Sequence, residues 1–175
     1  VTTTGTQTYS GAVTLSANVT LTSSNDNFTF SSTVDSDGST RNLTLSAGSG
    51  TIGISNAIGG SAALGTLTIT QSGGVTFSGN INAAIVTLTD TTGNVTFAGN
   101  TTLTTLNTAS QDYNVIFNGS TNTITNAVTF SNTGSLTFGN ASSDSSTFNN
   151  GLTTTAPSQI NIGGTLQTSN DAMSL

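Results

Sequence analysis

The chain of 175 residues contains no cysteine and no histidine, and its formal net charge is −6 because seven acidic residues, all aspartate, stand against one basic residue, Arg41. One arginine cannot neutralise the phosphates of a nucleic acid or of an anionic membrane, so we exclude both as partners. The absence of cysteine excludes disulfides and thiolate metal sites. No apolar stretch is long enough to span a membrane, and because the chain begins at Val1 without a signal peptide we expect a mature or excised part of a longer protein.

An apolar and mostly aromatic position recurs along the chain at intervals of about 20 to 24 residues. Its members are Tyr9, Phe30, Ile54, Phe77, Phe97, Phe117, Phe138 and Ile162. A second column lies two residues earlier and consists of Gln7, Phe28, Ile52, Val75, Val95, Val115, Leu136 and Ile160. The residue between the two columns is mostly polar. This alternation is typical of a strand with one buried face, and its repetition predicts a solenoid with both columns in the core.

Two more apolar positions follow in each repeat. The third column is Val13, Val34, Ile58, Ile81 and Leu166, and it decays to Thr101, Thr121 and Ser142 in the later repeats. The fourth column is Val19, Leu43, Leu67, Val86, Leu106, Val128 and Leu152. Three short strands per repeat, joined by turns of Gly, Asn, Ser and Asp, predict an all-β, right-handed parallel β-helix of about eight turns that forms a single domain over residues 1–175. Such apolar periodicity argues against disorder, although the composition is polar and low in charge.

The one carboxylate pair that could carry chemistry is Asp35 with Asp37, in VDSDGST. We interpret this segment first as a turn between strands. A weak calcium site is the second interpretation, because two carboxylates could project from the same face of an extended segment. Catalysis comes last. The chain lacks His, Lys, Glu and Cys, so a serine nucleophile would have no base, and we expect no enzyme and no cofactor other than calcium.

One glycine-rich segment matches a nucleotide-binding pattern. Gly48, Gly50 and Gly53 match the dinucleotide pattern G-x-G-x-x-G. That pattern binds pyrophosphate only at the amino end of a helix, and here the continuation ISNAIGG is turn and strand. The match therefore predicts no nucleotide site.

Polar side chains on the outer faces offer further hypotheses. Thr-x-Thr runs occur as Thr66, Thr68 and Thr70, as Thr87, Thr89 and Thr91, as Thr102 and Thr104, and as Thr123 and Thr125. If their registers match, they form a flat array of hydroxyl and methyl groups that could bind ice, whereas the simpler interpretation is strand propensity and solubility. We also expect an amide ladder of Asn80, Asn100 and Asn140 at one corner.

The remaining candidates are aromatic rings and glycosylation sites. Tyr9 and Tyr113 could stack on sugars, although their spacing favours the core. Sequons such as those at Asn18 and Asn94 arise freely in this composition, so glycosylation is an open alternative.

Segments such as GTQTYSGAVTLSANVTL, VDSDGSTRNLTLSAGSG and GGVTFSGNINA resemble the repeats of filamentous-haemagglutinin-type and autotransporter passenger proteins, which are large bacterial surface polypeptides. The resemblance implies a secreted, cell-surface β-helical stalk with an adhesive or shielding role. We therefore expect an extracellular structural element. Its uncapped ends should associate head to tail or continue into further repeats, and it could also meet host or environmental surfaces. The alternative function is an ice- or polysaccharide-binding solenoid.

Overall fold

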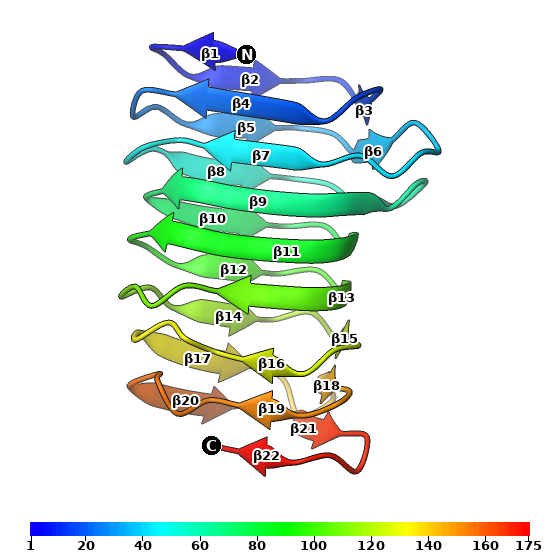
Figure 1. Cartoon of the computed structure of the whole chain (residues 1–175), viewed down its shortest axis with the longest axis vertical. Helices are drawn as coiled ribbons and strands as arrows, with labels where there is room; N and C mark the ends of the chain where they lie inside the picture. Colours follow the sequence, from blue (N-terminus) through cyan, green and yellow to red (C-terminus); the bar gives the residue numbers. More distant parts are fainter.

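The computed structural model describes all residues from 1 to 175 and contains strands and turns but no helix (Figure 1). Neighbouring strands pair in parallel, and the rear sheet holds eight strands, one for each turn. In Figure 1 the front strands run to the left and the fainter rear strands run to the right while the chain descends, so the coil is right-handed. The predicted right-handed parallel β-helix of about eight turns is confirmed.

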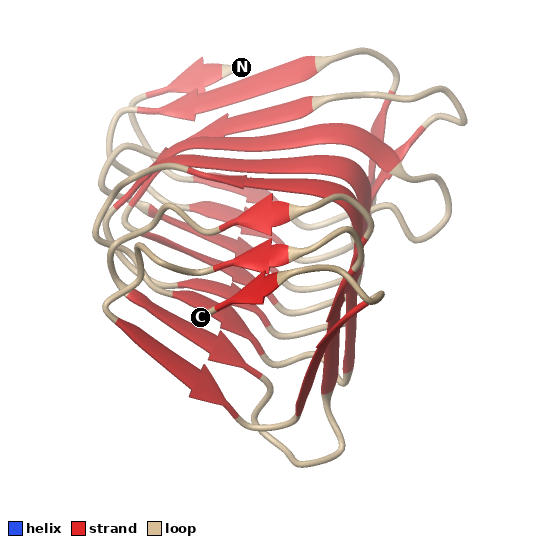
Figure 2. Cartoon of the chain, turned by 60° about the horizontal axis from the view of Figure 1, so that its bottom comes forward, coloured by secondary structure: helices blue, strands red, loops and turns tan.

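Each turn has three sides, which Figure 2 shows in an oblique view. The rear face is β2 (Gln7–Tyr9), β5 (Phe28–Phe30), β8 (Thr51–Ile54), β10 (Gly74–Phe77), β12 (Val95–Phe97), β14 (Val115–Phe117), β17 (Ser135–Phe138) and β20 (Gln159–Ile162). The side face includes β3 (Val13–Leu15), β6 (Val34–Ser36), β15 (Thr121–Ile124), β18 (Ser145–Phe148) and β21 (Thr165–Thr168). The front face includes β1 (Thr2–Thr3), β4 (Val19–Ser23), β7 (Leu43–Ser46), β16 (Val128–Thr129), β19 (Leu152–Thr153) and β22 (Met173–Ser174).

Three long strands replace separate side and front strands in the middle of the stack. They are β9 (Leu64–Ser72), β11 (Ile81–Thr91) and β13 (Thr101–Thr108). No Gly or Pro interrupts the sequence from Ile81 to Thr91 or from Thr101 to Thr108, so the backbone bends around the corner without leaving the strand conformation. The prediction of three short strands in every turn is therefore too simple for these central turns.

The predicted aromatic column is in register from the first turn to the last, because each member pairs with the next across the rear face. Its central members, from Phe30 to Phe138, are at most 1% exposed. Tyr9 in the first turn is half-buried. Ile162 is 49% exposed, so its expected place in the closed core is wrong. It faces inward in register with Phe138, but it lies in the last turn and nothing packs below it.

Aromatic rings stack along this column. The ring centroids of Phe97 lie 5.1 Å from Phe77 and 4.8 Å from Phe117, and the planes of Phe97 and Phe117 differ by 7°. Phe130 and Phe148 contact the lower part of the stack edge to face. The core of 34 buried apolar residues thus runs without interruption through the turns.

The third column differs from the prediction in its lower half. Val34, Ile58 and Ile81 are followed by Thr101, as expected, but then by Asn122 and Ser146 in place of Thr121 and Ser142. The corner before Ser146 is lengthened by a loop in which the Asp144 carboxylate accepts hydrogen bonds from the N–H groups of Asn140 and Ala141. Because a corner can gain residues without disturbing the strands, a fixed spacing from the aromatic column does not predict which residue faces inward after the corner.

Glycines occupy the corner that follows the rear strands. Gly79, Gly99 and Gly119 stack in consecutive turns, and a Cβ on Gly99 would overlap with the carbonyl group of Gly79. A Cβ on Gly119 would meet the carbonyl of Gly99 in the same way. The sharp corner therefore requires glycine for close backbone approach.

We predict that Phe97→Ala lowers the free energy of unfolding by about 3 to 5 kcal/mol, because it opens a cavity between two aromatic rings. Urea unfolding followed by circular dichroism measures this change. A loss below about 1 kcal/mol would contradict the packing described for Phe97.

We predict that Gly99→Ala destabilises the protein by more than about 2 kcal/mol, because the new methyl group collides with backbone that cannot move independently. Gly11→Ala is the matched control, since a Cβ at Gly11 meets nothing within 4 Å. Equal urea midpoints for the two variants would refute the steric argument.

Candidate functional site

The two carboxylates of VDSDGST lie in different structures. Asp35 is part of strand β6, and its Oδ1 accepts hydrogen bonds from the N–H groups of Ser61 at 2.9 Å and Ala62 at 3.4 Å. Asp37 lies in the following bend, where its Oδ1 accepts from Arg41 Nε at 2.9 Å and its Oδ2 from an Arg41 terminal nitrogen at 2.7 Å. The interpretation of the segment as a turn therefore fits Asp37 but is wrong for Asp35. Both carboxylates already have donors, and calcium at Asp35 would have to compete with two backbone N–H groups.

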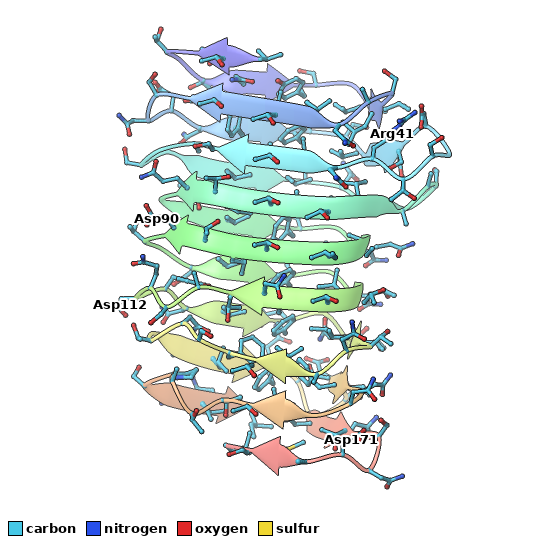
Figure 3. All side chains as sticks on the ribbon, viewed as in Figure 1. Arg41, Asp90, Asp112 and Asp171 are labelled. Carbon is cyan, nitrogen blue, oxygen red and sulfur yellow. The ribbon has the colours of Figure 1, made fainter.

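The Arg41 guanidinium lowers the pKa of Asp37, and the N–H of Ser39 contributes to the same shift. The ion pair is exposed to solvent, which limits its contribution to stability. The other aspartates are dispersed: Asp90 and Asp112 lie along one edge of the solenoid, whereas Arg41 lies at the opposite edge (Figure 3). The structure holds no group of three or more His, Cys, Asp or Glu residues that could bind a metal.

The predicted threonine array is short and irregular. Thr68 pairs with Thr87 on the neighbouring turn, but Thr66 pairs with Ile85. The outward column of Thr20, Thr44, Thr68 and Thr87 ends at Asn107. Thr70 lies at a register shift between β7 and β9.

Thr91 is 1% exposed, so its assignment to a binding surface is wrong. The chain bends inward at the corner after Thr89, and the Thr91 hydroxyl lies 3.2 Å from that of Ser72 inside the coil. The hydroxyl of Thr89 is also engaged, because it donates to the carbonyl of Ile69 at 2.9 Å. These contacts leave no flat hydroxyl lattice on β9 and β11.

Tyr113 presents no ring face to solvent, whereas Tyr9 has one ring face covered by Phe30 and stays partly exposed in the first turn. Tyr113 is 1% exposed, and its burial raises the pKa of its hydroxyl to about 12, although Ala109 and Thr108 act in the opposite direction. Tyr9 is half-buried, stacks on Phe30 at 4.7 Å and donates its hydroxyl proton to Gln7 Oε1 at 2.7 Å. Sugar stacking on Tyr113 is therefore excluded in this fold.

Asparagines link turns, although in a different way from the predicted amide ladder. Asn80 Oδ1 accepts from the N–H of Asn100 at 2.9 Å, and Asn100 Oδ1 accepts from the N–H of Thr121 at 3.1 Å. Asn140 is not part of this series. Several other asparagines also join a side-chain oxygen to the backbone N–H of the next turn, as Asn18 does for Asn42.

One concave region of about 290 Å³ lies on the outer surface where the long strands bend, and we call it the corner groove. It is lined by Thr40, Ala63, Leu64, Asn82, Ala83, Ala84, Thr102, Leu103, Thr104 and Thr125. The floor consists of Leu64, Ala83 and Leu103, which pair across β9, β11 and β13 and are at most 4% exposed. The lining contains no charged residue.

The walls of the corner groove come from residues on either side of the bend. Asn82 and Thr102 pair with each other on the side-face wall. Ala84 and Thr104 follow the floor residues on the front-face wall. The sequence pattern indicates Thr102, Thr104 and Thr125 only as members of Thr-x-Thr runs and does not indicate the other lining residues. The small residues in INAAIV were the available signal, because Ala83 and Ala84 leave space at the bend.

No protein family model matches this chain, and neither a curated protein nor a solved structure matches it. Because the structure contains no helix, it contains none that could cross a membrane.

We predict that Tyr113 destabilises the protein at high pH. Its folded pKa of about 12 exceeds the ordinary value of 10.0, so the stability due to its burial is fully present below pH 10 and is lost as pH rises through 12. The loss should reach about 2 to 3 kcal/mol relative to Tyr113→Phe, measured as the difference in urea midpoints. In a Tyr9→Phe variant, Tyr113 is the only tyrosine that remains. An absorbance titration of its phenolate with a midpoint near the ordinary pKa of 10.0 would refute this account.

Proposed function

We propose that the chain is a non-catalytic structural element of an extracellular bacterial surface fibre or stalk, and that its solenoid pairs end to end with further β-helical turns. Those turns come from a continuation of the same chain or from another copy. The extracellular and bacterial setting derives from the resemblance to filamentous-haemagglutinin-type repeats. The absence of His, Lys, Glu and Cys supports a non-catalytic role, because no side chain with an ordinary pKa near neutrality is available for proton transfer.

The observation that carries this proposal is the exposed inner surface of the last turn. Ile162 and Met173 are 49% and 38% exposed, whereas their partners in the preceding turn, Phe138 and Leu152, are 1% and 2% exposed. Strands β20, β21 and β22 pair on one side only. Their other edges present unpaired N–H and C=O groups beside apolar side chains, which is the surface that another turn of parallel strands would cover.

The first turn is more polar on its inside. Gln7 replaces the apolar residue of the second column and is only 6% exposed. Its Nε2 donates to Thr3 Oγ1 at 3.0 Å and to the carbonyl of Thr22 at 2.8 Å, and its Oε1 accepts from Tyr9. The two ends are therefore chemically different, which suits directional, head-to-tail pairing better than pairing of like ends.

We predict that the 175-residue chain forms elongated assemblies and that Ile162→Lys abolishes them, because an ammonium group would be buried at the joint. Analytical ultracentrifugation and electron microscopy measure the assembly state. Thr76→Lys on the exposed outer side of the rear face is the control and should assemble normally.

A dispersed monomer of 17.4 kDa at high protein concentration would overturn pairing between copies of this chain and leave only continuation into further turns of the same chain. Loss of assembly in both lysine variants would also count against pairing between copies, because charge alone would then explain the effect. Circular dichroism melts establish that each variant is folded.

A further inference from the structure

We propose that the corner groove is a binding site for a neutral oligosaccharide that lies along the solenoid axis. This site goes beyond the scaffold function and does not depend on it. The groove is a concave surface on the middle turns, away from both open ends.

The polar side chains of the groove have unused hydrogen-bonding capacity. Asn82, Thr102 and Thr104 are exposed, and their side chains make no hydrogen bond within the chain, as is also true of the side chains of Thr40 and Thr125. This contrasts with Asn80 and Asn100 at the nearby corner, whose side-chain oxygens bind the next turn. Amide and hydroxyl groups that do not serve the fold are available to a ligand rich in hydroxyl groups.

The geometry favours a ligand that runs across the strands. Asn82 and Thr102 are register partners on neighbouring turns, and Thr102 is in turn paired with Thr123. Polar groups therefore recur along the axis at the spacing of hydrogen-bonded strands, about 4.8 Å. A chain of sugar rings lying along the axis would meet a new polar group at each turn.

The walls can accept the apolar faces of sugar rings. Leu64, Ala83 and Leu103 lie beneath the groove but are at most 4% exposed, so the apolar surface open to a ligand is the methyl groups of Ala63 and Ala84. A peptide strand is a poorer fit, because the backbone groups of β9, β11 and β13 are already paired with each other and offer no edge.

Charge selects a neutral ligand. The groove contains no charged side chain, and the net charge of the chain is −6. Arg41, which follows Thr40, is held by both carboxylate oxygens of Asp37. An acidic sugar would find no free cation here and would be repelled by the charge of the protein.

The site is preorganised for binding. β11 is paired with β9 from Ala83 to Thr91 and with β13 from Ile81 to Leu88, so backbone hydrogen bonds hold the groove walls. Binding would therefore require little ordering of the protein. Without an aromatic platform we expect dissociation constants of about 0.1 to 1 mM.

The test uses the 175-residue chain with cellohexaose, laminarihexaose, maltohexaose and hexagalacturonic acid. Calorimetry measures affinity, and amide chemical shifts locate the ligand. At least one neutral hexasaccharide should bind and shift Asn82, Ala84 and Thr104. The double variant Thr102→Val with Thr104→Val should weaken binding at least about tenfold, because it removes two hydroxyl groups and keeps the β-branched shape. Thr76→Val with Thr96→Val, on the rear face, is the matched control and should bind as the unmodified chain does.

Three outcomes would overturn the proposal. The first is no shift in the groove with any neutral hexasaccharide at about 10 mM. The second is an equal loss of binding in the rear-face control. The third is binding of hexagalacturonic acid as tight as that of the neutral sugars. All three would leave the scaffold proposal untouched, because end-to-end assembly is measured without sugar.

Discussion

Parallel backbone pairing between successive turns is the constraint on which the rest of the structure depends. It places equivalent residues directly above one another at about 4.8 Å, so that every sequence position becomes a column. Inside the coil the columns bring like side chains together, as in the stack of Phe77, Phe97 and Phe117. Outside the coil they bring each side chain within reach of the next backbone. Asn42 Oδ1, for example, accepts the N–H of Thr66 one turn away.

The corners obey a different constraint, which is steric. Backbones of neighbouring turns approach directly where the chain changes direction, and a side chain fits only if it points away. Gly79, Gly99 and Gly119 satisfy this requirement at one corner, and Asn150 takes a left-handed conformation with φ of 69° at another. Corners can nevertheless lengthen outward, as the Asp37–Arg41 bend does, because an excursion into solvent leaves the strand register unchanged.

This division explains how far the sequence predicts the structure. The columns of the rear face could be predicted from the sequence, because each rear strand is short, has an inward-facing residue near both ends and contains no insertion. The prediction of Thr121 and Ser142 in the third column is wrong because corner length varies. The prediction of Thr91 on the outer surface is wrong because the chain bends inward before it. The groove could not be predicted from spacing, since it arises where the bends of three strands align. Ile162 follows the pattern perfectly in register, and its exposure is a property of the last turn and not of the pattern.

A repetitive core also needs features that distinguish one turn from another. Phenylalanine rings would stack equally well on any other ring of the column, so they specify alignment poorly. Buried polar groups are more selective, because each costs free energy unless a partner is present. Asn122 donates to the carbonyl of Gly119 at 2.9 Å and to Ser146 Oγ at 3.3 Å, and Asn132 donates to the carbonyl of Tyr113 at 3.0 Å. If either asparagine moved by one turn, its amide would face different neighbours and would lose its hydrogen bond to the adjacent turn. The apolar columns therefore provide most of the stability, and these few polar contacts favour one alignment of the turns, although the Oδ1 atoms of Asn122 and Asn132 are buried without a partner.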